Sequence, residues 1–152
     1  MKKTVIILIS FLVLTIASCI KEEILERPLS QLNIWNCYNQ TTWNNNKITN
    51  ELIGRWIWIY SENSWHPDEG WETENENTVI EFINDSTLNV SVDDEIVNTA
   101  HWTLEIKDTD LYGLVLDKSI SQLYGRILIC GEIIEFNNSY IDGSDNYFKR
   151  IK

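Results

Sequence analysis

The stretch Leu52-Ile53-Gly54-Arg55-Trp56 opens the first of several short runs of β-branched and aromatic residues. Clusters of Asn, Asp, Gly and Ser separate these runs at short intervals. Such punctuation is typical of an all-β fold with hairpin connections. The runs predict strands at 52–60, 78–83, 87–92, 96–107, 111–116, 124–130, 132–136 and 146–151.

The predicted strands follow one another without a long amphipathic helix and without a repeated strand–helix–strand spacing. This order favours an antiparallel meander. Closing the meander into a barrel would remove the exposed strand edges that otherwise invite aggregation. A small barrel and a sandwich are both compatible with the pattern.

Gly54-Arg55-Trp56 resembles the Gly-x-Trp signature that opens the first strand of lipocalins. Lipocalins stack an arginine of the last strand on this tryptophan, and Arg150 stands at the matching place. From about residue 50 to residue 152, the chain resembles the lipocalin-like lipoproteins of Gram-negative bacteria. The resemblance implies an all-β fold, a small antiparallel eight-stranded lipocalin-like β-barrel, with Gly54, Trp56 and Arg150 at its closed floor.

The interior of such a barrel is either filled by side chains or holds one small ligand. Six aromatic residues compete for this interior, namely Trp56, Trp58, Tyr60, Phe82, Trp102 and Phe136. The sequence therefore leaves a packed core and an open cavity as alternatives.

The longest predicted connection, 61–77, carries Trp65 and Trp71. It follows the first strand, where lipocalins place a lid over the barrel mouth. Large aromatic rings can stack on a sugar or on a flat apolar ligand. Together with Trp58 and Tyr60, these residues form the predicted site for a small apolar or glycan-derived ligand. The alternative is that both rings cap the barrel, which is then a solid-core assembly, adhesion or inhibitor module that contacts an envelope protein.

The N-terminus has the features of a removable export segment. Lys2 and Lys3 precede an apolar run of about 13 residues, which is shorter than the roughly 20 residues needed to cross a bilayer. Ile16-Ala17-Ser18-Cys19 resembles the bacterial lipobox, in which cleavage precedes a cysteine that carries diacylglycerol. Residues 1–18 are therefore predicted to be a lipoprotein signal peptide, with lipidation at Cys19. An ordinary secretory signal is the alternative.

Lys21-Glu22-Glu23 resembles a signal that exports lipoproteins to the outer face of the outer membrane in some Gram-negative bacteria. We therefore expect an outer-membrane location with display on the cell surface. Residues 19–48 are predicted to be a lipidated, polar tether, of which a part packs on the domain through apolar side chains such as Trp35 and Trp43. Residues 49–152 form the predicted barrel domain, and Thr49 is expected to cap one helical turn.

The predicted mature chain is strongly acidic. Cleavage after residue 18 removes two lysines from a chain with 12 basic and 23 acidic side chains, so that the formal net charge becomes −13. An acidic surface repels phosphate groups, and we therefore expect no nucleic-acid partner. Attachment to the membrane must then come from the acyl chains on Cys19.

Cys37 and Cys130 are the two cysteines left after Cys19 is assigned to lipid. In an exported protein they can form one disulfide, and two free buried thiols are the alternative.

The sequence gives no indication of catalysis. A Gly-x-Ser-x-Gly motif is absent, and the acidic pairs are no more than an acidic composition explains. His66 with Asp68 and Glu69 could bind a cation only weakly, because the second histidine is not at ligand spacing. We therefore expect no enzyme activity, no cofactor and no metal site.

Changing Cys19 to Ser should release the protein from the membrane fraction and abolish its labelling by radioactive palmitate, because serine offers no thiol for diacylglycerol transfer. Unchanged labelling of this variant in intact cells would contradict the lipoprotein assignment.

Overall fold

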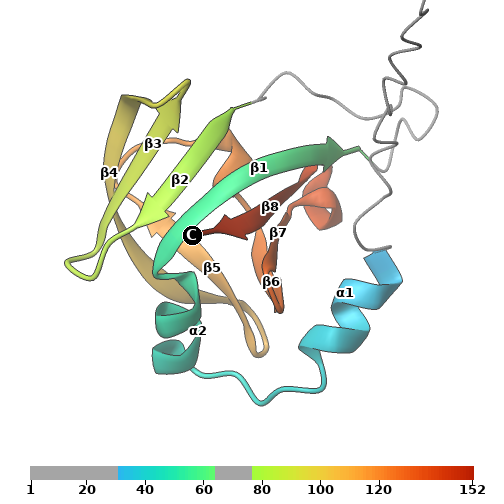
Figure 1. The fold of residues 1–152 in the computed structure, drawn as a ribbon. Coiled ribbons are helices and arrows are strands. Elements are labelled where there is room, and N and C mark those ends of the chain that lie inside the picture. The colour runs from blue at the N-terminus through green and yellow to red at the C-terminus, as the bar shows by residue number, and fades with distance from the viewer. Residues whose placement is uncertain (1–30, 64–76) are drawn as a thin grey trace, which may run out of the picture.

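A computed structural model describes residues 31–63 and 77–152 of the chain (Figure 1). Two helices, α1 (Gln31–Tyr38) and α2 (Asn45–Leu52), precede eight strands and two short 3₁₀ helices. The strands are β1 (Gly54–Glu62), β2 (Thr78–Phe82), β3 (Thr87–Val92), β4 (Glu95–Asp108), β5 (Leu111–Leu116), β6 (Arg126–Cys130), β7 (Ile133–Asn137) and β8 (Asp145–Ile151). The 3₁₀ helices are η1 (Ser121–Leu123) and η2 (Ser139–Ile141). Within these residues, no helix is long and apolar enough to cross a bilayer.

The strands form one antiparallel sheet in the order β5-β4-β3-β2-β1-β8-β7-β6. The first strand pairs with the last, and the sheet curves until its edge strands β5 and β6 meet (Figure 1). A Cβ on Gly113 would lie 2.6 Å from the carbonyl oxygen of Gly125, so the absence of a side chain allows this approach. Near the same seam, Arg126 forms an ion pair with Asp108 at 2.6 Å. The predicted eight-stranded antiparallel barrel is thus confirmed, and it is nearly closed.

The boundaries at the start of the barrel were predicted wrongly, and most of the other strands differ from their predicted bounds by one or two residues. The turn expected at Thr49 is part of α2, which begins four residues earlier, and β1 consequently begins at Gly54 rather than at Leu52. Asn44 caps this helix, because its side-chain oxygen accepts a hydrogen bond from the Lys47 N–H at 2.9 Å. Ile48 and Leu52 lie four residues apart on the helix and are both fully buried, so packing on the barrel stabilises α2.

The floor of the barrel is built around Trp56, which is fully buried. Its indole Nε1 donates a hydrogen bond to the Leu52 carbonyl at 2.8 Å. The Arg150 guanidinium lies 4.1 Å from the Trp56 ring centre and donates to the carbonyl oxygens of Ile53 at 3.0 Å and Glu51 at 2.5 Å. Gly54 has φ +123°, and a Cβ there would lie 3.1 Å from Arg150 Nη1. The last strand is therefore joined to the end of α2 at the start of β1.

Helix α1 packs outside the barrel, against β6 (Figure 1). Ile34 and Tyr38 of the helix are buried together with Leu128 of β6. A disulfide joins Cys37 to Cys130 across this contact, with 5.7 Å between the two Cα atoms. Part of the segment predicted as a tether thus packs on the barrel, as its apolar residues indicated.

Replacing Arg150 with Ala should lower the free energy of unfolding by about 2 to 3 kcal/mol, because it removes the cation from the indole face and two charge-assisted hydrogen bonds. Arg150→Lys should recover only part of this loss, since an ammonium lacks the planar fork. Denaturant unfolding measures both. The neighbouring exposed change Lys149→Ala is the control and should cost less than about 0.5 kcal/mol; an equal loss in the two alanine variants would contradict this role of Arg150.

Candidate functional site

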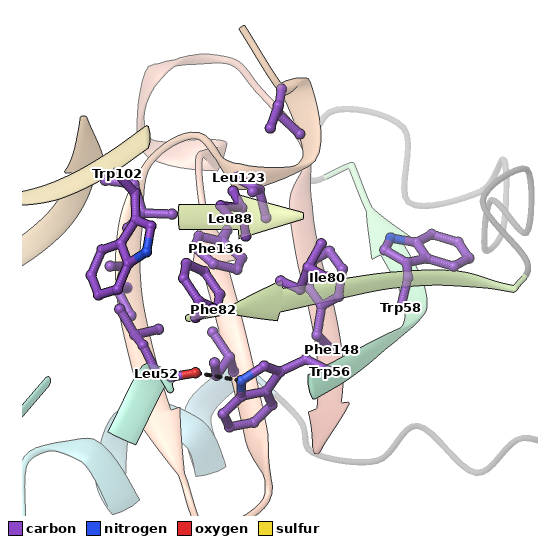
Figure 2. Close-up of a cluster of buried hydrophobic side chains, with 14 of the residues drawn as sticks. Leu52, Trp56, Trp58, Ile80, Phe82, Leu88, Trp102, Leu123, Phe136 and Phe148 are labelled. Carbon is purple, nitrogen blue, oxygen red and sulfur yellow. Dashed lines mark hydrogen bonds between the residues drawn. The ribbon is translucent and has the colours of Figure 1, made fainter. Parts of the chain in front are cut away.

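Large side chains occupy the barrel interior, where a barrel that carries a ligand would hold it (Figure 2). Trp56, Phe82, Phe136 and Phe148 are each at most 1% exposed. Phe136 and Phe148 meet edge to face with 5.7 Å between ring centres. Further apolar residues of the strands, of α2 and of the segment between β5 and β6 join the same core, among them Leu88, Trp102, Ile120 and Leu123.

Trp58, predicted to line the ligand site, is 4% exposed inside this core. Its Nε1 donates a hydrogen bond to Asn146 Oδ1 at 3.1 Å. Both polar atoms are thereby satisfied within the barrel wall, and the indole packs as part of the core.

Tyr60 does not share the interior face with Trp58, where the sequence pattern placed it. A β-bulge lies between the two residues, so that Trp58 pairs with Phe148 and Tyr60 with Tyr147. Adjacent residues of a strand point to opposite faces, and Tyr60 and Tyr147 therefore lie on the outer face of the sheet. Their rings stack there with 4.4 Å between centres.

Glu135 belongs to the same outer row, because it pairs with Tyr147 on one side and with Leu128 on the other. Its side chain is fully buried, and its Oε1 accepts a hydrogen bond from Asn137 Nδ2 at 2.9 Å. Burial raises the pKa of Glu135 to about 8, and the nearby carboxylates of Asp145 and Glu62 add to this rise. Glu135 is therefore largely protonated at neutral pH. Burial likewise raises the pKa of the Tyr147 hydroxyl.

A groove of about 420 Å³ crosses the outer face of β8, β1 and β2 and ends at the β3–β4 turn. Its floor is formed by Ile57, Val79 and Ile151, and its rim includes Arg55, Asp93 and Asp94. Ile57 and Val79 are paired in register, as are Arg55 and Ile151.

The rim of the groove carries opposite charges at its two ends. Asp93 and Asp94 form the two-residue β3–β4 turn, both with positive φ, and Asp93 Oδ1 accepts a hydrogen bond from Asn77 Nδ2 at 2.8 Å. Arg55 lies farther along β1, opposite Glu81 of β2. The groove can therefore accommodate an apolar group between a cation and an anion.

Several predicted residues lie outside the part of the chain that the structure describes. These are the lipidation site Cys19, the candidate ligand-binding residues Trp65 and Trp71, and His66 with Asp68 and Glu69. In residues 31–63 and 77–152, the structure has no group of three His, Cys, Asp or Glu side chains arranged to hold a metal ion.

The sequence alone does not reveal the groove, because its residues come from three strands, from the β3–β4 turn and from Asn77, which precedes β2. A usable signal was present in β1, where Ile57 is an apolar residue at an outward position between the buried Trp56 and Trp58. An apolar side chain on the outward face of an alternating strand can mark a binding surface.

Comparisons of the chain with protein-family models, with curated proteins and with solved structures found no match.

Glu135→Gln should stabilise the protein at pH 8 and flatten its pH dependence. In the unfolded chain Glu135 ionises near pH 4.5, whereas in the fold it stays protonated until about pH 8, so stability contributed by the protonated form is present below pH 4.5 and is lost as the pH rises toward 8. Over this interval the loss amounts to roughly 4 to 5 kcal/mol at most.

The measurement is the free energy of unfolding of both proteins between pH 4 and pH 9. The exposed change Glu132→Gln on the β6–β7 turn is the control and should leave the profile unaltered. Parallel profiles for Glu135→Gln and the parent protein would contradict the assigned protonation of Glu135.

Proposed function

We propose that this protein is an outer-membrane lipoprotein, anchored by acyl chains on Cys19 and displayed on the cell surface, whose barrel binds an envelope protein through its outer face. The export segment, the lipobox resemblance and Lys21-Glu22-Glu23 support the location. The proposed role is binding rather than catalysis.

The filled interior is the observation that supports binding on the outer face. A ligand inside the barrel would have to displace side chains such as Trp56, Phe136 and Phe148, which are fully buried. Removing one large core side chain from its packed position typically costs about 3 to 5 kcal/mol. A small apolar or glycan-derived ligand would bind inside the barrel only if its contacts there were more favourable than this loss of packing.

The barrel fold also fits a ligand carrier, in which Trp65 and Trp71 would contact a small apolar or glycan-derived molecule. The two functions differ in what the protein carries when it is isolated. A carrier retains a bound small molecule after isolation, whereas a packed scaffold is isolated with no small molecule bound.

Native mass spectrometry of the mature protein, gently released from its own cells, distinguishes the two. For the packed scaffold we expect the native and denatured masses to agree once the acyl chains are counted in both. A discrete additional mass that disappears on denaturation, and that is lost in Trp65→Ala/Trp71→Ala but retained in the exposed control Tyr124→Ala, would contradict the proposal and identify the cargo.

A further inference from the structure

We propose that the groove on the outer face of β1 and β2 binds an extended peptide segment of a partner protein, with a basic, an apolar and an acidic side chain on one face. This inference rests on the proposed function, in which the outer face of the barrel is the binding surface. It assigns the basic side chain to Asp93 and Asp94, the apolar one to Ile57 and Val79, and the acidic one to Arg55.

The floor of the groove supplies the apolar contact. Ile57 and Val79 stand opposite each other on β1 and β2, and both point outward because their neighbours Trp56, Trp58 and Ile80 are core residues. Val79 is only 8% exposed although it lies on the outer face, so the groove shelters it. A sheltered apolar floor excludes water from a side chain that is placed on it.

The two ends of the groove supply complementary charge. Asp93 follows Val92, which pairs with Thr78, whereas Arg55 stands opposite Glu81. Three to four residues of β2 thus separate the acidic end from the basic end, a distance of roughly 10 to 13 Å.

Arg55 is the residue that can attract an acid. It forms no ion pair within residues 31–63 and 77–152, although Glu81 stands opposite it. Lys149 of β8 pairs with Ile57 and so stands level with the middle of the groove, not at its Arg55 end. Arg55 lines the groove whereas Glu81 does not, so Arg55 is the charge that a carboxylate in the groove would meet.

An extended peptide matches this spacing. Alternate side chains of a strand share one face and lie about 6.6 Å apart, so the first, third and fifth residues span about 13 Å. A pentapeptide Lys-Thr-Ile-Thr-Glu presents its lysine, isoleucine and glutamate at these positions. Acetyl and amide groups at its ends leave only the side-chain charges.

The test titrates this capped pentapeptide into the isotope-labelled mature protein and follows the amide NMR signals. We expect saturable shifts centred on Ile57, Val79 and the β3–β4 turn, with a dissociation constant in the millimolar range or below. Arg55→Glu should weaken binding at least about threefold, because it replaces an attraction by a repulsion. Lys107→Glu, which makes the same change of charge on the distant end of β4, should leave binding unchanged.

A charge-exchanged peptide completes the test. Lys-Thr-Ile-Thr-Lys should bind the Arg55→Glu protein more tightly than the parent protein. Lys-Thr-Ser-Thr-Glu should bind both proteins weakly, because it lacks the apolar side chain. The inference is overturned if the first peptide causes no saturable shifts at concentrations up to about 10 mM, which corresponds to a binding free energy weaker than about 3 kcal/mol. It is likewise overturned if Arg55→Glu and Lys107→Glu weaken binding equally.

Failure of this inference and failure of the proposed function give different results. An absence of peptide binding with no cargo in the native mass spectrum removes the groove but leaves an outer-face scaffold. A retained cargo mass removes the scaffold itself.

Discussion

The stacking of the Arg150 guanidinium on the Trp56 indole is the interaction on which the rest of the barrel depends. It joins the start of β1 to the end of β8, and the same guanidinium holds carbonyl oxygens at the C-terminal end of α2. Those carbonyls have no partner inside the helix, and a cation there also favours the helix dipole. One side chain thus fixes the helix, the first strand and the last strand together, and it joins the two halves of the sheet, whose edge strands β5 and β6 meet elsewhere.

Residue alternation and turn clusters were sufficient to predict the strands, because a half-buried strand must alternate and its connections must be polar. The floor formed by Gly54, Trp56 and Arg150 could also be anticipated, because Gly54 and Trp56 are two residues apart in the sequence and Arg150 is recognised by its place in the last strand.

The start of α2 was missed because Asn44 and Lys47 show no apolar periodicity, and the helix depends on burial of Ile48 and Leu52. The place of Tyr60 was missed because a single bulged residue reverses the face of every residue after it. The groove and the burial of Glu135 depend on register between strands that are distant in sequence.

The two faces of the sheet have different physical characters. The inner face is apolar, and its side chains pack against one another. Asn146 is a polar residue there, and its side-chain oxygen accepts a hydrogen bond from Trp58. The outer face is mixed: it buries a carboxyl at Glu135, whose pKa burial raises to about 8, and it leaves Arg55 and the β3–β4 acids exposed on either side of an apolar floor. Specific recognition requires such heterogeneity, because a surface of one character cannot orient a partner.

The bond between Cys37 and Cys130 also determines how the molecule bears mechanical load. If the chain is pulled between a point upstream of α1 and its C-terminus, the force passes through the disulfide directly into β6. The residues between the two cysteines then carry none of this force along the backbone. The force then acts on the hydrogen bonds between β6 and β7 and between β7 and β8. Where the pull is along the strands, these hydrogen bonds must break together by shear rather than one after another. The Trp56 floor and strands β2 to β5 lie within the bypassed covalent loop. In a reducing medium the same tension would pass through α1 and α2 to Gly54, and the floor would become the first part of the fold to be strained.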